Sequence, residues 1–387
     1  MIRHTFFYLL MIPVLAGCAS TNLPPVTSRE YQPLPEEKRI WMTSEQEEQR
    51  LAESGMIFKD KELTDYLNQV AAEVLPKEAK KKIVLEVFVI DNPYTNAFAY
   101  PNGKVYVHTG ILARMENEAQ LATVLGHEMA HVVRRHMVRE RRSIRNKAAG
   151  LASFNATFGS LPLVGELSSA LGELGTMASV SGYSKALETE ADNLGFKWMQ
   201  AAGYDPRESP KLFEHMMAEN EEDGIKEPFF FGSHPKLKDR YANYQSSLSA
   251  EGTIKGGKKN QSRYEKAVAP AIYETARLDL KAGRYGKAEK GVQRYLKTYP
   301  RSSRAHFLLG EVYRQRDEKG DYQKAIQSLN LASKYNRKYA KSYRSLGLIY
   351  MNLKKRNAAR NAFQAYLTRA PNAEDVGFIK EYIRQLK

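Results

Sequence analysis

The sequence predicts an α+β chain, in which a mainly helical domain with a small antiparallel sheet is followed by an α-solenoid. Apolar residues recur at helical spacing through much of residues 61–202. β-Branched and aromatic runs between 83 and 108 indicate a few short strands. After residue 262, similar residues return with a period near 34, which is typical of stacked helix pairs. A length of 387 residues suits two or three such units.

The distribution of charge supports this division. Residues 252–387 contain 31 basic and 11 acidic residues, a net charge of +20, whereas residues 1–251 contain 28 and 33, a net charge of −5. The single cysteine, Cys18, excludes an intramolecular disulfide. The expected domains are residues 41–251, a polar glycine-containing linker at 252–262 and the repeats at 263–387.

The N-terminus is similar to a bacterial lipoprotein signal. In residues 1–17 a basic start precedes an apolar run shorter than the ~20 residues that span a bilayer. The run ends in Leu-Ala-Gly-Cys, so we expect cleavage before Cys18 and a lipid on that cysteine; the alternative is an ordinary signal beside a chance cysteine. Ala19 replaces the aspartate that retains lipoproteins in the inner membrane, which predicts the outer membrane of a diderm bacterium, facing the periplasm. Residues 18–40 contain four prolines and are expected to form an extended tether.

Short helices and strands are expected next. Ser44 and Glu47 have the spacing of a capping box for a helix over 44–54, and residues 61–75 form an amphipathic helix that ends at Pro76. The expected strands are residues 83–90, 96–100 and 104–108, the last two joined by a Pro-Asn-Gly turn. An edge of this sheet could accept an extended peptide as an added strand, although the strands could equally serve only to cover the core.

The residues that determine function begin with the motif His127-Glu128-Met129-Ala130-His131. Residues i and i+4 share one face of a helix, so both imidazoles can reach one ion, and Glu128 can hold a water bound to it. Asn117 and Gln120 have the spacing of a helix cap before the motif. The alternative to a metal-binding motif is a helix with two surface histidines and an ordinary glutamate.

A catalytic zinc site needs a third protein ligand and one open position. Glu188 and Asp192 lie at i and i+4 on a later predicted helix, so Glu188 is the candidate ligand, and Asp192 is expected to hydrogen-bond a ligating histidine. Glu190 is the rival ligand but points away from their common face. Residues 148–182 are rich in Gly, Ala, Ser and Leu, and they suit either a lid over a cleft or a helical hairpin packed on the core.

In order and form, several segments are similar to the HtpX-like and CAAX-prenyl-protease-like gluzincins. These segments are Asn96-Ala97-Phe98-Ala99, the 103–107 strand, the 127–131 motif, the 188–192 helix and Ser233-His234-Pro235 followed by Arg240. The resemblance covers roughly residues 40–250. It implies one Zn²⁺ per chain bound by His127, His131 and Glu188.

The same resemblance implies roles for four more residues. Glu128 would be the general base, and Asp192 would support a ligand. His234 resembles a loop histidine that can approach the metal and hold the site shut; a transition-state hydrogen-bond donor or a plain turn are the alternatives. Arg240 resembles the arginine beside that histidine, near the cleft. His108, His136 and His215 are expected to be structural.

The C-terminal half resembles tetratricopeptide repeats. Leu309-Gly310 and Tyr313 recur 37 residues later, and Ala325 and Leu329 recur 34 residues later, as Ala359 and Phe363. About three helix pairs are expected, with residues 374–386 as a cap. Such stacks form a groove for extended chains or partner proteins, and its basic residues suit acidic segments. Nucleic acid is not expected as a partner of an exported chain.

Signal, motif and repeats together resemble the periplasmic BepA-like branch of these zinc metallopeptidases. The resemblance implies an endopeptidase at the outer membrane that degrades misfolded or stalled outer-membrane proteins. It also implies partners in the β-barrel assembly machinery, reached through the repeats. The alternative is a chaperone or assembly scaffold that acts mainly through the repeats, with the zinc site held shut.

Overall fold

The computed structural model describes residues 20–147, 170–223, 237–252 and 256–386. The signal peptide, Cys18, most of the 148–182 segment and His234 lie outside these residues. The elements are α1 (Pro35–Glu53), α2 (Lys61–Val74), α3 (Lys77–Lys80), β1 (Glu86–Ile90), β2 (Ala97–Ala99), β3 (Lys104–His108), α4 (Thr109–Arg114), α5 (Glu118–Val133), α6 (His136–Lys147), α8 (Glu173–Thr176), the π-helix η1 (Met177–Ser181), α9 (Lys185–Ala201), α10 (Glu208–Asp223), α12 (Leu237–Ala250), α13 (Gln261–Lys281), α14 (Tyr285–Thr298), α15 (Ser303–Arg316), α16 (Asp321–Tyr335), α17 (Ala340–Asn352), α18 (Arg356–Arg369) and α19 (Val376–Gln385). None of the helices among these residues is both long and apolar enough to cross a membrane.

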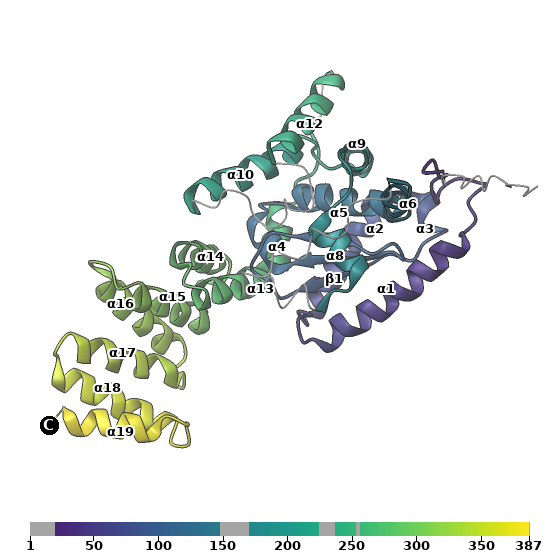
Figure 1. Ribbon diagram of the computed structural model, residues 1–387. Coiled ribbons are helices and arrows are strands. Elements are labelled where there is room, and N and C mark those ends of the chain that lie inside the picture. Colours follow the sequence, from purple (N-terminus) through teal and green to yellow (C-terminus); the bar gives the residue numbers. More distant parts are fainter. Residues whose placement is uncertain (1–19, 148–169, 224–236, 253–255, 387) are drawn as a thin grey trace, which may run out of the picture.

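The fold class is as predicted, a mainly helical domain with a small sheet followed by a helical solenoid (Figure 1). The sheet is mixed rather than purely antiparallel. Its strand order is β1-β3-β2, with β1 parallel and β2 antiparallel to β3. The predicted hairpin therefore exists, but β3 is the central strand and β2 lies at the edge. Because β3 leads directly into α4 and α5, the sheet sets where the motif helix begins.

The first helix begins earlier than the sequence suggested. Pro35 occupies the first helical turn, and the Glu37 carboxylate accepts a hydrogen bond from the Leu34 N–H, so α1 starts there rather than at Ser44. Ser44 lies inside the helix, where its hydroxyl donates to the Ile40 carbonyl. Glu47 is not a cap; it is buried and accepts hydrogen bonds from residues of α8 and from Tyr100.

The segment before α1 was expected to be a tether, yet its described part packs on the domain. The Val26 N–H donates to the Val133 carbonyl at the end of α5 (2.9 Å), and the Val26 and Tyr31 side chains are buried. The carbonyl of Pro24 accepts a hydrogen bond from Arg135 (3.0 Å). The prolines therefore give an extended segment that is fixed along the end of the motif helix.

The motif helix ends two residues after the motif. It stops at Val133, and Arg135 adopts the left-handed conformation with φ of 59°. The basic residues that follow belong to a separate helix, α6. Asn117 caps α5 as predicted, because its side chain accepts a hydrogen bond from the Gln120 N–H (3.1 Å). All residues of α5 are buried among the residues that the structure describes.

Helix α9 crosses α5 through a contact between two glycines. A Cβ atom on Gly126 would lie 2.9 Å from the Gly195 carbonyl oxygen, and one on Gly195 would lie 2.7 Å from the His127 nitrogen. Both neighbours are backbone atoms, so they cannot turn aside as a side chain would. The two helices therefore approach more closely than larger residues allow, directly beside the 127–131 motif.

The described part of the expected linker after residue 255 is also fixed in place. Lys258 pairs with Tyr204 as an isolated parallel bridge, and the Lys259 carbonyl accepts a hydrogen bond from the Glu118 N–H at the start of α5 (2.9 Å). Helix α13 then packs on α4, where the Tyr264 hydroxyl donates to the Leu112 carbonyl (2.7 Å). One hydrophobic core extends from the first domain into the C-terminal helices, as far as Ala362 of α18.

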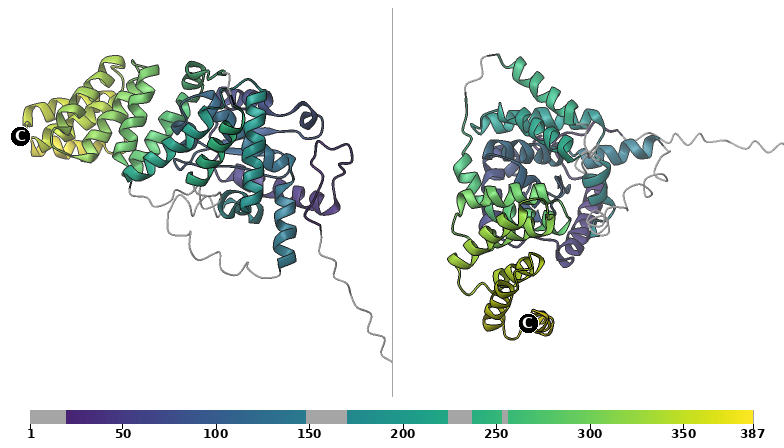
Figure 2. Two further views of the ribbon diagram at one scale, coloured as in Figure 1. Left: turned by 90° about the horizontal axis from the view of Figure 1, so that it is seen from above. Right: turned by 90° about the vertical axis from the view of Figure 1, so that its left-hand side faces the viewer.

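The repeats form three helix pairs, α13/α14, α15/α16 and α17/α18, capped by α19. In the left view of Figure 2 they project from one side of the first domain, with the C-terminus at their far end. The repeating residues have equivalent contacts. A Cβ atom on Gly310 would lie 2.6 Å from Leu329, and one on Gly347 would lie 2.4 Å from Phe363, so each Leu-Gly step lets the second helix of its pair approach.

The residues described between 170 and 182 pack on the core rather than standing apart. Leu171, Leu174 and Met177 are buried, and α8 packs on α1. The Asn96 amide donates to the Ser179 hydroxyl (2.8 Å), which joins η1 to the sheet beside β2. In this part of the segment, the packed interpretation is the one observed.

We expect Gly195→Ala to lower the free energy of unfolding by about 1–3 kcal/mol, because the new methyl group has no room against the α5 backbone. Gly286→Ala is the matched control, since a Cβ atom there meets nothing within 4 Å. The control should stay neutral or become more stable by up to about 1 kcal/mol. Urea denaturation followed by circular dichroism measures both, and equal stability of the two variants would contradict the close helix contact.

Candidate metal centre

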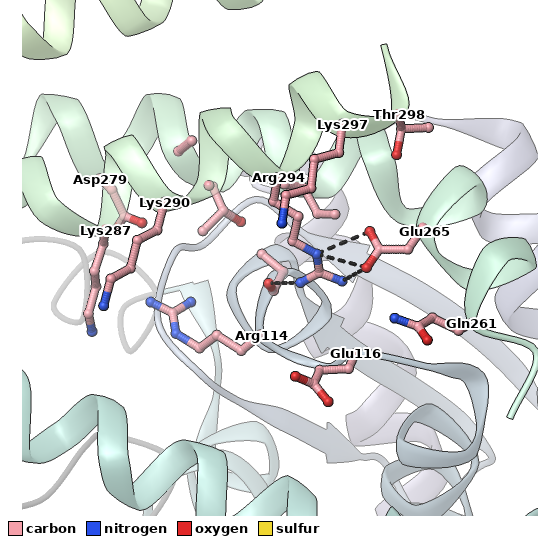
Figure 3. Close-up of a pocket in the computed structure, with 15 residues that line it drawn as sticks. Arg114, Glu116, Gln261, Glu265, Asp279, Lys287, Lys290, Arg294, Lys297 and Thr298 are labelled. Atoms are coloured by element: carbon pink, nitrogen blue, oxygen red, sulfur yellow. Dashed lines mark hydrogen bonds and ion pairs between the residues drawn. The ribbon is translucent and has the colours of Figure 1, made fainter. Parts of the chain in front are cut away.

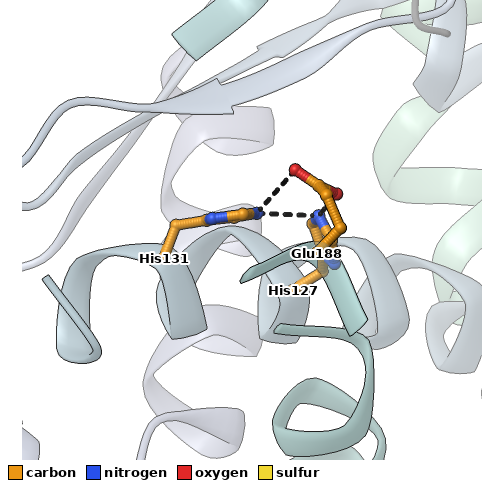
Figure 4. A group of neighbouring side chains, drawn as sticks. All are labelled: His127, His131 and Glu188. Carbon is orange, nitrogen blue, oxygen red and sulfur yellow. Dashed lines mark hydrogen bonds and ion pairs between the residues drawn. The ribbon is translucent and has the colours of Figure 1, made fainter. Parts of the chain in front are cut away.

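Three predicted residues converge in the structure. His127 and His131 extend from one face of α5, and Glu188 reaches them from the first turn of α9 (Figure 4). The two Nε2 atoms are 3.0 Å apart. Glu188 Oε2 lies 3.4 Å from His127 Nε2, and Glu188 Oε1 lies 3.6 Å from His131 Nε2. All three side chains are at most 2% exposed.

This arrangement fits a zinc ion. Ligand atoms about 2.1 Å from a tetrahedral zinc lie roughly 3.4 Å from one another. The three observed separations scatter around that value, and the three ligand atoms lie within 4.8 Å of each other. Two neutral imidazoles and one carboxylate are donors that zinc commonly accepts. Among the described residues, this is the group of metal-ligating type that the structure brings together.

Glu128 lies beside this cluster and has no structural partner for one of its oxygens. It is 2% exposed, and Oε1 accepts no hydrogen bond from any residue the structure describes. Burial raises the pKa of Glu128 well above its ordinary value, and the nearby carboxyl group of Glu188 adds to the effect. A buried carboxylate oxygen without a partner is costly for folding alone. It is therefore suited to bind a water or a substrate group.

A carboxylate and a guanidinium support the first histidine. Asp192 Oδ1 lies 2.9 Å from His127 Nδ1, as predicted, and also accepts hydrogen bonds from Arg240 (2.6 Å) and the Tyr244 hydroxyl (3.0 Å). Burial by itself would raise the pKa of Asp192, but the Arg240 charge and the His127 contact hold it well below its ordinary value. Arg240 is thus buried behind the three candidate ligands, with its Nη2 2.9 Å from His127 Nδ1.

His131 also has close neighbours, which include His136, expected to be structural, and Tyr183, for which the sequence indicated no role. The ring of Tyr183 stacks on that of His131, with centroids 4.2 Å apart. His136 Nδ1 lies 2.9 Å from His131 Nδ1, and His136 Nε2 lies 3.4 Å from Glu190. Glu190 pairs with Arg134 and Arg139, so it is not a rival ligand. Five-residue spacing gives no signal for such a contact, because on a continuous helix His136 would face elsewhere.

Two cavities differ in their relation to this centre. A crevice too small to hold a water molecule lies beside Glu128 and Arg240. Its other lining residues are Ile111, Val124, His127, Leu212, Phe213 and Met216. A larger pocket of about 500 Å³ lies at the junction of α4 with α13 and α14 (Figure 3). It contains none of the converging residues. Its charged lining residues are Arg114, Glu116, Glu265, Asp279, Lys287, Lys290, Arg294 and Lys297.

We expect Glu188→Gln to lose most of its bound zinc, because a neutral amide oxygen binds Zn²⁺ more weakly than a negatively charged carboxylate. Glu208→Gln is the control, since Glu208 is also buried but bonds to Asn117 and Gln120 at the far end of α5. Zinc per chain, measured by inductively coupled plasma mass spectrometry after dialysis, should fall only in the first variant. Full zinc occupancy of Glu188→Gln would show that the third ligand is another residue.

Comparison with known proteins agrees with this geometry. Residues 59–247 match peptidase family M48, and residues 273–333 match the tetratricopeptide repeat family. The chain is 33% identical over 233 residues to the mitochondrial metalloendopeptidase OMA1 of Schizosaccharomyces pombe, covering 57% of this chain and 67% of that protein. It is 28% identical over 204 residues to the beta-barrel assembly-enhancing protease of Escherichia coli, covering 50% of this chain and 40% of that protein.

A solved structure of the MamA protein, 19% identical, covers 37% of this chain and 80% of its own length with a TM-score of 0.27. The matched lengths differ, because the chain spans two thirds of the yeast relative but well under half of the Escherichia coli one. The family matches and the yeast relative agree on the first domain, and the repeat match agrees with the helix pairs seen after residue 260. This chain therefore belongs to peptidase family M48, as a metalloendopeptidase domain followed by tetratricopeptide repeats.

Proposed function

We propose that this chain is a zinc-dependent endopeptidase of the bacterial envelope, tethered to the periplasmic face of the outer membrane. The observation on which the catalytic proposal depends is the convergence of His127, His131 and Glu188 beside the unpartnered oxygen of Glu128. When bound, zinc supplies a Lewis acid for the scissile carbonyl and lowers the pKa of a water. The protein residues supply the proton transfer and the geometry.

In this proposal Glu128 Oε1 accepts the proton of the attacking water and returns it to the leaving amine. Asp192 accepts the Nδ1 proton of His127, so that Nε2 keeps its lone pair for the ion. Arg240 and Tyr244 hold Asp192 in place from the other side. The complete burial of these groups keeps their hydrogen bonds away from competing water.

The place of action and the substrates are proposed from the N-terminus and the relatives. A lipid on Cys18 would leave the described residues, which begin at 20, close to the membrane surface. The Escherichia coli relative is named a beta-barrel assembly-enhancing protease. We therefore infer misfolded or stalled outer-membrane proteins as substrates and the β-barrel assembly machinery as a partner of the repeats.

A scaffold or chaperone role is the second candidate, and the junction pocket favours it. This pocket joins α4 of the peptidase domain to α13 and α14, and basic side chains outnumber acidic ones in its lining. The excess of basic side chains gives this lining a positive charge, which would attract a chain segment with carboxylates. Binding at this place would act independently of the metal, so both activities could coexist in one molecule.

We expect Glu128→Gln to bind zinc normally and to cleave unfolded casein at least about a hundredfold more slowly, because the amide cannot take the water's proton. Initial rates of the purified full chain, with zinc content measured in the same samples, provide the test. His215→Gln, at a partly exposed residue of α10, is the control and should keep its rate. Undiminished cleavage by Glu128→Gln would exclude this mechanism.

We expect Cys18→Ala, combined with an ordinary cleavable signal, to release the protein into the soluble periplasmic fraction. The reason is that, in this proposal, the lipid on Cys18 attaches the chain to the membrane. Fractionation and immunoblotting of both forms measure this. If the variant stays with the outer membrane, the repeats or another surface must hold it there.

A further inference from the structure

The imidazole of His131 has a hydrogen-bond partner on the side that faces away from His127 and Glu188. His131 Nε2 is the atom beside His127 and Glu188, and its Nδ1 lies 2.9 Å from Nδ1 of His136. Both rings are buried, with exposures of 2% and 0%. The two rings stand at 77° to each other with centroids 4.9 Å apart, so the contact is edge-on and directed through the ring nitrogens.

The proton positions follow from the geometry. A histidine that binds a metal through Nε2 must carry its ring proton on Nδ1. His131 Nδ1 is then a donor, and His136 Nδ1 must accept. The remaining proton of His136 sits on Nε2, which lies 3.4 Å from Glu190 Oε2. Each group in the series His131, His136 and Glu190 thus has one defined tautomer or charge.

The far end of this series is fixed by two arginines. Arg139 donates to Glu190 Oε2 (2.8 Å), and Arg134 donates to Glu190 Oε1. Glu190 lies on α9, two residues after Glu188. The series therefore ties the end of α5 and the start of α6 to the helix that supplies the third metal-ligating residue.

His136 reaches this place only because the helix breaks before it. Arg135 has φ of 59°, a conformation that L-residues adopt rarely, and its side chain is buried. Glu37 of α1 accepts two hydrogen bonds from this guanidinium (2.8 and 2.6 Å), and the Tyr31 ring lies beneath it at 5.1 Å. The packed N-terminal segment and the start of α1 thus stabilise the turn that points His136 back toward His131.

We propose that His136 is a positioning residue for the metal: it accepts the Nδ1 proton of His131 and so fixes the tautomer and orientation of that ligand. The Arg135–Glu37 pair maintains the turn that this requires. His136 does for His131 what Asp192 does for His127. This inference rests on the proposed zinc site and adds a residue that the 127–131 motif does not include.

A purely structural role for His136 predicts different results. A buried histidine that only fills space would affect stability when replaced, but not the binding of the ion. The test therefore measures zinc affinity directly, by competition with a chromogenic chelator, and the visible absorption spectrum of the Co²⁺-substituted full chain. Neither measurement depends on turnover.

We expect His136→Ala to weaken zinc binding about ten- to a hundredfold and to alter the Co²⁺ absorption bands, because His131 loses the partner that orients it. His136→Asn should recover most of the affinity, since its amide oxygen can accept the same proton. Glu37→Gln weakens the ion pair with Arg135, so its zinc affinity should lie between those of His136→Ala and the wild type.

His108→Ala is the matched control, since His108 is equally buried in the same domain but bonds to the Tyr94 carbonyl. It should bind zinc as the wild type does, even if its stability falls. Wild-type affinity and Co²⁺ spectrum in folded His136→Ala would overturn the proposal, as would a His136→Asn variant no better than His136→Ala. If His136→Ala does not fold, the other two variants provide the test. Wild-type zinc affinity in Glu37→Gln, together with weakened zinc affinity in His136→Asn, would also overturn the proposal. Failure of the wild type itself to bind zinc would instead overturn the proposed function.

Discussion

The contact between Gly126 and Gly195 is the constraint on which the candidate metal centre depends. Side chains on two buried helices normally hold the backbones about 8–10 Å apart. Here neither helix has a Cβ atom at the crossing, and a methyl group on either one would meet backbone atoms within 3 Å. The crossing lies next to His127 and two turns after Glu188. A short carboxylate can therefore reach both imidazoles without bending either helix.

Closeness alone does not orient three buried ligands, and each histidine has its own second partner. Asp192 serves His127 and is bonded by Arg240 and Tyr244, whereas His136 lies against the other face of the cluster. Burying Asp192 and Arg240 together costs desolvation energy, which their mutual contact and the Tyr244 and His127 contacts offset. Replacing such a pair by apolar residues is often no less stable, so its position behind a proposed metal ligand is best explained by the site.

The spacing of residues along the chain predicted those features that depend on one face of a helix or on one repeat. The i, i+4 pairs His127/His131 and Glu188/Asp192, the Asn117 cap and the Leu-Gly steps of the repeats all appear where they were expected. The rest depends on tertiary contacts. The end of α5 is determined by a left-handed Arg135 that Glu37 holds from another helix. Likewise, prolines and glycines suggested a tether and a linker. The local sequence does not show that distant backbone groups pair with Val26 and Lys259 and fix these segments.

The fixed linker changes how the two domains can cooperate. A flexible connection would let the repeats search a volume, and the local concentration of a bound client near the metal would fall with linker length. In this structure, Lys259 caps the motif helix, and Arg294 of α14 donates to the carbonyls of Ala113 and Met115 at the end of α4. The repeats are thus built onto the elements that lead into the motif. If the first helix pairs hold a client, as the proposed function implies, that client would have a defined position relative to the cluster. Such a fixed position would select substrates by their geometry rather than by a local sequence.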